Sequence, residues 1–436
     1  MKRSIILLLV LLPIVAFSQM QNIINQGNTA TTQRRVGGNN TIDSSLIKIR
    51  SIDAHRLLVS MPDSSSIQTV FSYSTMGTNA TTLLTFPNLK IYDFKILAGN
   101  IYFCGQDING VGFIAWMTIS NLLSLNPVSF TVQLITNPFK LREVTELEVY
   151  KWDDGIHVVA LGDTRYLIDM NTSNPSTYQI MRLNTPNPFR ALSVGDTKIV
   201  TISRDSDTST VVTAFDKGNI QQYIHRGFTH PQLRYDKYVL ENSMVNTDIF
   251  TFAYTHRLVT NNTWYKTDFA TFDATAGINI INSQYIELSD AKLEPIDLEY
   301  CPEDTTLLYL TNGHKGYDEI FQIDPFAQNN YITTIIQPNP LVISKIKQYN
   351  SIIRYDNYYF AVFAKNSNSQ EGLIFDCQRN SSAQFGCANI FNELVYNINY
   401  LNNTLPNVIY SFYLGQQVPI LLKHSYAPDS NQIICQ

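Results

Sequence analysis

A unit of about 50 residues, close to the repeat length of propeller blades, recurs along this chain from Ser45 onward. Each copy begins with a short apolar strand, turns at polar residues, continues with a strongly apolar strand, crosses a polar loop and returns through a third strand. Seven segments follow this plan, with starts near residues 45, 92, 145, 190, 247, 296 and 351. Single blades bury their sheet faces only against neighbouring blades. The repeats therefore predict an all-β fold, a β-propeller of seven blades, with six to eight compatible with the irregular spacing.

The copy between residues 92 and 116 shows the plan most clearly. Its strands read YDFKI, IYFCG and GFIAW, and they are separated by the turn Gly99-Asn100 and the loop 107–110. Short strands bounded by Asn, Asp and Gly are typical of antiparallel sheets. Two β-sandwich domains would show the same features, and this architecture is the alternative to the propeller.

This layout resembles that of secreted bacterial β-propeller proteins of uncharacterised function. The resemblance rests on the strand and turn plan from Ile101 to Trp116 and extends over residues 45–377. It implies a propeller fold at the cell exterior. The sequence has no SxDxGxTW sialidase box, so the resemblance carries no activity to this chain.

The N-terminal segment has the layout of a cleaved secretory signal. Lys2 and Arg3 precede an apolar run from Ile5 to Phe17, and the small residue Ser18 follows. We expect a signal peptide at residues 1–18, a flexible leader at residues 19–43 that is rich in Asn, Gln, Thr and Gly, and a propeller domain at residues 44–436 with C-terminal closing strands. No later apolar stretch reaches the roughly 20 residues that span a bilayer. The mature protein is then expected to be secreted, periplasmic or held at the cell surface, without an integral membrane segment.

The charge of the chain argues against nucleic acid as a partner. The chain has 31 Lys and Arg residues against 36 Asp and Glu residues, a formal net charge of −5 at pH 7. Nucleic-acid binding depends on Lys and Arg side chains that neutralise phosphates. Nucleotide-binding glycine loops, the zinc-protease motif and the nucleophile elbow are also missing, so we expect no cofactor.

The five cysteines of the chain are Cys104, Cys301, Cys377, Cys387 and Cys435. An odd number leaves at least one thiol without a partner in the same chain. Export permits disulfides, and Cys377 and Cys387 are close enough in sequence to close a small loop, with Cys435 competing for either. Zinc is not expected, because the sequence has no CxxC pair and no His at ligand spacing.

An acidic residue occurs near the start of four units: Asp93, Glu146, Asp248 and Asp297. We place all four on first strands, and we favour the interpretation that they face water or accept hydrogen bonds from the neighbouring blade. If first strands line the axis, the same carboxylates crowd one mouth of a channel, where mutual repulsion raises their proton affinity or recruits a cation. They are then the candidate catalytic residues of a glycosidase, which needs two carboxylates.

The loop 107–110, with the sequence DING, is a candidate calcium site. Asp107 and Asn109 place oxygen ligands at alternate positions before a glycine, as at the start of a calcium loop. The remaining carboxylates of such a loop are missing, and Asn-Gly favours a tight hairpin turn, which is the preferred interpretation. The seven histidines are scattered, and His225 and His230 fit a solvated loop better than a metal site.

These observations favour a secreted, non-catalytic binding propeller that presents loops and a shallow axial pocket to a protein or glycan partner. Tyr, Asn and Asp in the loops suit this role, because aromatic faces stack on sugars and amides bond to hydroxyls. A carbohydrate-active hydrolase or lyase with carboxylates at the channel mouth is one alternative. A structural component of the cell surface is the other.

Overall fold

The computed structural model describes most of the chain between residues 48 and 435. The described ranges are 48–53, 56–62, 68–74, 81–86, 88–124, 130–136, 138, 140–163, 165–182, 189–206, 209–229, 233–258, 264–286, 293–313, 320–328, 332–336, 346–354, 359–366, 371–378, 408–413, 420–426 and 433–435. The expected signal peptide and leader lie outside these ranges.

The described strands form antiparallel sheets, and each sheet is built from a consecutive run of the chain. We name each sheet by its first strand. The β1 sheet comprises β1 (Lys48–Asp53), β2 (Arg56–Pro62), β3 (Gln68–Ser74) and β4 (Thr81–Phe86). The β5 sheet comprises β5 (Leu89–Leu97), β6 (Asn100–Asp107), β7 (Gly112–Thr118) and β8 (Thr131–Leu134). The β9 sheet comprises β9 (Val144–Trp152), β10 (Gly155–Gly162), β11 (Tyr166–Asn171) and β12 (Gln179–Arg182).

The remaining sheets repeat this arrangement. The β13 sheet comprises β13 (Phe189–Val194), β14 (Lys198–Ser206), β15 (Ser209–Asp216) and β16 (Asn219–Thr229). The β17 sheet comprises β17 (Leu233–Asn242), β18 (Ile249–Leu258), β19 (Trp264–Asp273) and β20 (Asn279–Ile286). The β21 sheet comprises β21 (Leu293–Cys301), β22 (Thr306–Gly313), β23 (Ile320–Ile323) and β24 (Ile332–Ile336). The β25 sheet comprises β25 (Ile346–Arg354), β26 (Tyr359–Asn366), β27 (Glu371–Gln378), β28 (Val408–Tyr413), β29 (Ile420–Tyr426) and β30 (Ile433–Cys435).

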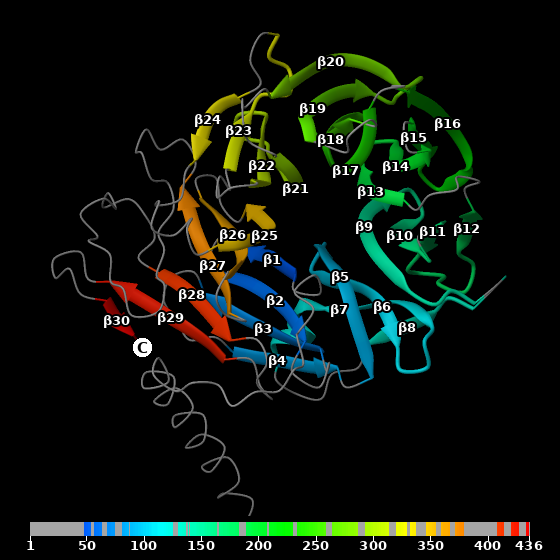
Figure 1. Ribbon diagram of the computed structural model, residues 1–436. Helices are drawn as coiled ribbons and strands as arrows, with labels where there is room; N and C mark the ends of the chain where they lie inside the picture. The colour runs from blue at the N-terminus through cyan, green and yellow to red at the C-terminus, as the bar shows by residue number, and fades with distance from the viewer. Residues whose placement is uncertain are drawn as a thin grey trace, which may run out of the picture.

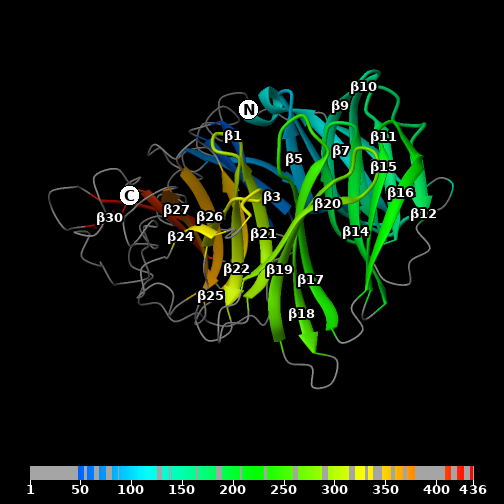
Figure 2. The same ribbon diagram turned by 90° about the horizontal axis from the view of Figure 1, so that it is seen from above.

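The sheets stand around a common axis, and the chain colours follow one another around the ring (Figure 1). The first strands of successive sheets contact each other in chain order, and β25 also contacts β1. Seen from above, the strands within each sheet lie next to one another (Figure 2). The fold is therefore an all-β β-propeller, and the alternative of two β-sandwich domains is wrong.

Apolar clusters fill the spaces between neighbouring sheets. On β6, Phe103 belongs to the cluster shared with the β1 sheet, whereas Tyr102 and Cys104 belong to the cluster shared with the β9 sheet. Successive strand residues point to opposite faces, and here both faces are covered by a neighbouring sheet. This arrangement explains why Ile101–Cys104 is an uninterrupted apolar run rather than an alternating one.

Helix is rare among the described residues. The helix α2 (Ile119–Leu123) connects β7 to the segment before β8, and the Thr118 hydroxyl accepts a hydrogen bond from the Asn121 amide at its start. A Thr in this position satisfies one of the amides that a helix start leaves unpaired. Within the ranges described, no helix combines the length and apolar character needed to cross a membrane.

Candidate functional site

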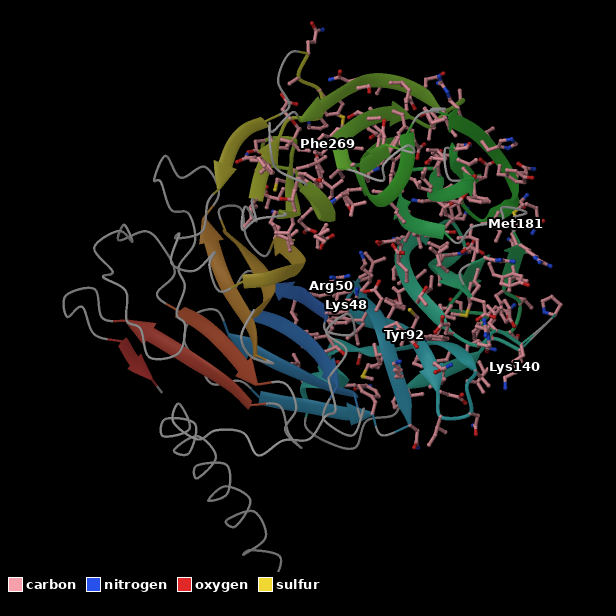
Figure 3. The ribbon with its side chains drawn as sticks, in the orientation of Figure 1. Lys48, Arg50, Tyr92, Lys140, Met181 and Phe269 are labelled. Carbon is pink, nitrogen blue, oxygen red and sulfur yellow. The ribbon has the colours of Figure 1, made fainter. Side chains whose placement is uncertain are left out.

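Charged side chains from the first strands meet at the axis of the propeller. Lys48 and Arg50 of β1 lie near the middle of the ring, whereas Met181 of β12 lies toward its rim (Figure 3). Residues two positions apart on a strand point to the same side of the sheet. On several first strands, two such positions both carry charged side chains. We call the following residues the axial cluster: Lys48, Arg50, Asp93, Lys95, Glu146, Glu148, Glu241, Asp297 and Glu299.

Asp93 of β5 connects three sheets through its carboxylate. The group accepts hydrogen bonds from the Phe94 amide at 2.9 Å, from the Leu147 amide of β9 at 3.3 Å and from the Arg50 guanidinium of β1 at 3.0 Å. Arg50 also donates to the Phe94 carbonyl at 3.0 Å. Asp93 is 4% exposed, so its charge is offset by these donors rather than by bulk water.

Two further carboxylates predicted from the sequence also bond to the following sheet. Glu146 of β9 accepts from the Leu192 amide of β13 at 3.2 Å. Asp297 of β21 accepts from the Ile352 amide of β25 at 3.0 Å. In both cases, as with Asp93, the amide belongs to the first strand of the next sheet. Three predicted residues therefore share one geometric role: each accepts a hydrogen bond from the next sheet.

The sequence interpretation missed other charged residues of the axial cluster that lie on the same first strands. Lys95 forms an ion pair with Glu148 of the next sheet, and Glu299 accepts from the Arg354 amide at 3.3 Å. Lys95 and Glu299 each lie two positions after a predicted acid on the same strand, and Glu148 does so on β9. The period of two, applied to the first strands, is the signal that identifies them.

Burial and crowding raise the pKa of several axial carboxyl groups. Desolvation, followed by repulsion from Asp93 and Glu148, raises the pKa of Glu146 to about 8. Desolvation, followed by repulsion from Asp297, raises the pKa of Glu299 to about 7. Burial also raises the pKa of Asp297. Part of the axial cluster is therefore protonated near neutral pH.

Glu241 of β17 differs from the other acids of the axial cluster. Among the described residues it has no hydrogen-bond donor and no ion-pair partner. Desolvation, followed by repulsion from Glu299 and Glu148, raises the pKa of Glu241 well above its ordinary value. Six carboxyl groups face three cations in the cluster as defined above, which leaves an excess of negative charge when all are ionised.

Asp248 does not lie on a first strand, so that part of the prediction is wrong. It precedes β18, the second strand of its sheet. Its carboxylate accepts from the amides of Thr197 and Lys198, both at 2.9 Å, and thereby holds the β13–β14 turn of the preceding sheet. The unit that begins near residue 247 in the sequence starts at the wrong strand, because β17 mixes charged and apolar residues and hides its alternation.

Asp107 and Asn109 form the turn between β6 and β7. One Asp107 oxygen accepts from the Asn109 amide at 2.9 Å and from the Val111 amide at 2.7 Å. Gly110 has φ of 68°, in the region that favours glycine. The carboxylate is thus used by the turn itself. In the part of the chain that the structure describes, no group of three or more His, Cys, Asp or Glu side chains is placed to hold a metal ion.

The cysteines that the structure describes fully are buried thiols. Cys104 and Cys301 are both buried, and burial raises the pKa of the Cys104 thiol well above its ordinary value. A neutral buried thiol is a poor nucleophile. The predicted disulfide between Cys377 and Cys387 lies outside the described residues, because Cys387 and the side chain of Cys377 are not among them.

Two described histidines lie in different environments, one exposed on a strand and one buried between two aspartates. His225 lies on strand β16, not in a loop, and it is exposed, whereas His230 lies outside the described residues. His157 of β10 is buried between two aspartates. Its partners are Asp154, three positions earlier, and Asp169, on the next strand. Only strand pairing brings Asp169 close, so no local sequence signal identifies this network.

No protein-family model and no curated protein matches the chain. Solved structures that are similar to it include apo AztD from Citrobacter koseri, at 10% identity and a TM-score of 0.41, covering 76% of this chain and 82% of that one. The β-propeller domain of Cps50 (Swd1) from Myceliophteria thermophila has 10% identity and a TM-score of 0.47, covering 79% and 98%. Dihydro-heme d1 dehydrogenase NirN in complex with DHE has 11% identity and a TM-score of 0.46, covering 80% and 73%. The assignment of this chain to the β-propellers therefore rests on its own sheet arrangement.

Proposed function

We propose that this protein is a non-catalytic binding propeller that acts at the cell exterior and presents its loops and a shallow axial pocket to a protein or glycan partner. The observation that supports this proposal is the use of the axial carboxylates. Asp93, Glu146 and Asp297 each accept a backbone amide of the next sheet. A group that holds two sheets together is poorly suited to donate and accept protons during turnover, because each change of charge disturbs that contact.

The excess of carboxyl groups in the axial cluster favours a partner with a cationic group. Glu241 has no donor among the described residues, and its neighbours Glu148 and Glu299 repel its charge. A Lys or Arg side chain at the channel mouth relieves this repulsion and displaces bound protons. A protein with an exposed basic segment therefore fits the cluster better than a neutral glycan.

The test is an array of basic, neutral and acidic peptides and of glycans, probed with purified residues 19–436. We expect basic peptides to bind. The double variant Glu241→Gln, Glu299→Gln should weaken this binding at least about tenfold, because it removes two groups that can ionise beside a bound cation while keeping an acceptor for the Arg354 amide. Asp153→Asn is the matched control, since Asp153 is an exposed acid of the β9–β10 turn outside the axial cluster, and it should bind like the original protein.

Binding of neutral glycans that is unaffected by the double variant would assign the partner to the glycans instead. A hydrolase or lyase remains the second candidate, because a carboxyl group with a pKa of about 8, as at Glu146, is in the range of a general acid. Release of reducing ends from the arrayed glycans, abolished by Glu146→Gln without loss of melting temperature, would support the enzyme and contradict the binding role.

The proposal includes a propeller of seven blades and export with removal of residues 1–18. The cycle of contacts between first strands supports the blade number. The charged, apolar and small-residue order of the N-terminus supports export and the resemblance to secreted bacterial propellers. An experimental structure decides the first point. Mass spectrometry of the exported protein, with Gln19 expected as its first residue, decides the second.

A further inference from the structure

His157 is held between two carboxylates from different parts of the β9 sheet. Its Nδ1 lies 2.9 Å from Asp169 Oδ1, and its Nε2 lies 2.8 Å from Asp154 Oδ1. An ionised carboxylate only accepts hydrogen bonds, so both contacts are satisfied only when both ring nitrogens carry a proton. The geometry therefore calls for the imidazolium form of His157.

The two carboxylates differ greatly in exposure. The Asp169 side chain is 1% exposed, whereas the Asp154 side chain in the β9–β10 turn is 62% exposed. Asp169 also accepts from the Tyr150 hydroxyl at 2.9 Å, and this hydroxyl in turn accepts from the Gly218 amide of the β13 sheet at 3.3 Å. The buried half of the network thus connects two sheets, and the exposed half holds one turn.

The charged groups around His157 favour its proton. Burial alone would lower the pKa of His157, but the hydrogen bonds and charges of Asp169 and Asp154 outweigh burial and raise it. The bonds from His157 and Asn171 lower the pKa of Asp154. Tyr150 of β9 stacks on the imidazole with 5.1 Å between the ring centroids, and the Lys217 ammonium lies 4.8 Å from the centroid of the Tyr150 ring.

We propose that His157 is a pH-sensitive latch that tightens the β9–β10 turn when the imidazole is protonated and loosens it when the imidazole is neutral, while the Asn171 side chain still donates to the Asp154 carbonyl and carboxylate. A neutral imidazole has a single N–H, so one of the two carboxylates loses the hydrogen bond from the ring. Asp169 is buried and would keep only the Tyr150 hydroxyl as a donor, at a desolvation cost, whereas water and the Asn171 side chain can both donate to Asp154. The bond to Asp154 therefore breaks first, and the contact between the β9 and β13 sheets persists.

The direction of the pH dependence follows from the raised pKa of His157. The latch contributes its full stability below the unfolded pKa of about 6.5, and this contribution is lost as pH rises through the higher folded value. The turn is therefore held most firmly below about pH 6.5, and this contact weakens as pH rises through the folded pKa of His157. This inference does not depend on the binding role proposed above.

The experiment is hydrogen exchange of the full-length mature chain, followed by mass spectrometry of peptides that cover residues 150–158 at pH 6 and pH 9. After correction for intrinsic exchange, we expect the protection of this segment to fall at least about fivefold at pH 9. Asp154→Asn should be less protected at pH 6 and show no further pH dependence. Asp153→Asn, which changes the adjacent exposed acid, should behave like the original protein.

A second measurement follows the imidazole itself. In protein labelled with nitrogen-15 in its histidines, the titration midpoint of His157 should lie above the ordinary histidine value of about 6.5, and Asp154→Asn should lower it by about half a pH unit or more. Protection that is equal at both pH values, or a His157 midpoint that Asp154→Asn leaves unchanged, would overturn the latch. Both readouts use substitutions at an exposed position, so the fold is preserved.

Discussion

Single carboxylates of the axial cluster differ in what they do for the fold. Asp93 has three donors from three sheets, whereas Glu241 has none among the described residues. A buried acceptor that loses its charge while its donors remain destabilises the folded state. Glu241 meets more repulsion, from Glu299 and Glu148, than attraction, from Lys95, so it loses little when it becomes an amide. Residues of one chemical type and one location thus have opposite effects on stability.

The substitution Asp93→Asn should lower the free energy of unfolding by about 1–3 kcal/mol, because the amide is a weaker acceptor and brings an NH₂ group against the Arg50 guanidinium. Glu241→Gln is the matched control and should change it by less than about 0.5 kcal/mol or increase it. Urea denaturation of both variants measures this difference. Equal losses in the two variants would show that the amide contacts of Asp93 contribute nothing.

At the scale of strands and turns, the hairpin connections place backbone where side chains cannot fit. Gly218 lies in the turn between β15 and β16 with φ of 73°, and a Cβ at this position would lie 2.6 Å from Trp152 Nε1. Trp152 is the last residue of β9, so this turn packs on the neighbouring sheet. Gly227 lies within β16, and a Cβ there would meet nothing within 4 Å.

Gly218→Ala should therefore lower the free energy of unfolding by about 1–3 kcal/mol, from the positive φ and the displaced indole together. Gly227→Ala should leave it within about 0.5 kcal/mol of the original value, since no atom opposes the new methyl group. Thermal unfolding followed by circular dichroism distinguishes the two. A Gly227→Ala variant that is as unstable as Gly218→Ala would contradict the role of the turn packing.

Much of the element order could be predicted from the sequence, and the limits are physical. The apolar runs and turns marked most unit starts within a few residues, as with β9 near residue 145 and β13 near residue 190. The acids Asp93, Glu146 and Asp297 were correctly placed on first strands. Their partners were missed because backbone amides carry no sequence signature, and Leu147, Leu192 and Ile352 look like ordinary core residues. The His157 network depends on strand register, which a single sequence does not reveal.

For the whole molecule, each sheet is covered by its neighbours, so the ring protects what a single sheet exposes. The β1 sheet supplies Leu58 and Phe86 to a cluster that also contains Phe94, Phe103 and Phe113 of the β5 sheet. Similar clusters join the β9 sheet to the β13 sheet and the β17 sheet to the β21 sheet. The stability of one sheet is therefore inseparable from the presence of the next.

Deletion of residues 44–86 should leave a chain that aggregates, because one apolar face of the β5 sheet loses its cover. Gel filtration and the binding of a hydrophobic dye provide the measurement, with the uncut residues 19–436 as the reference. A soluble monomer that unfolds in one step would show that the remaining sheets close on themselves. The apolar clusters would then be interchangeable partners rather than specific ones.

The axial carboxylates have one more consequence, which concerns the origin of the ring. Asp93, Glu146 and Asp297 all reach forward along the chain, and each is received by a main-chain amide that every residue except proline possesses. A duplicated segment of the gene thus brings its own connector and needs no matching side chain in the segment that follows. Recombination can then change the number of sheets without a second, compensating mutation in a neighbouring sheet, and the sequences of the sheets are free to diverge.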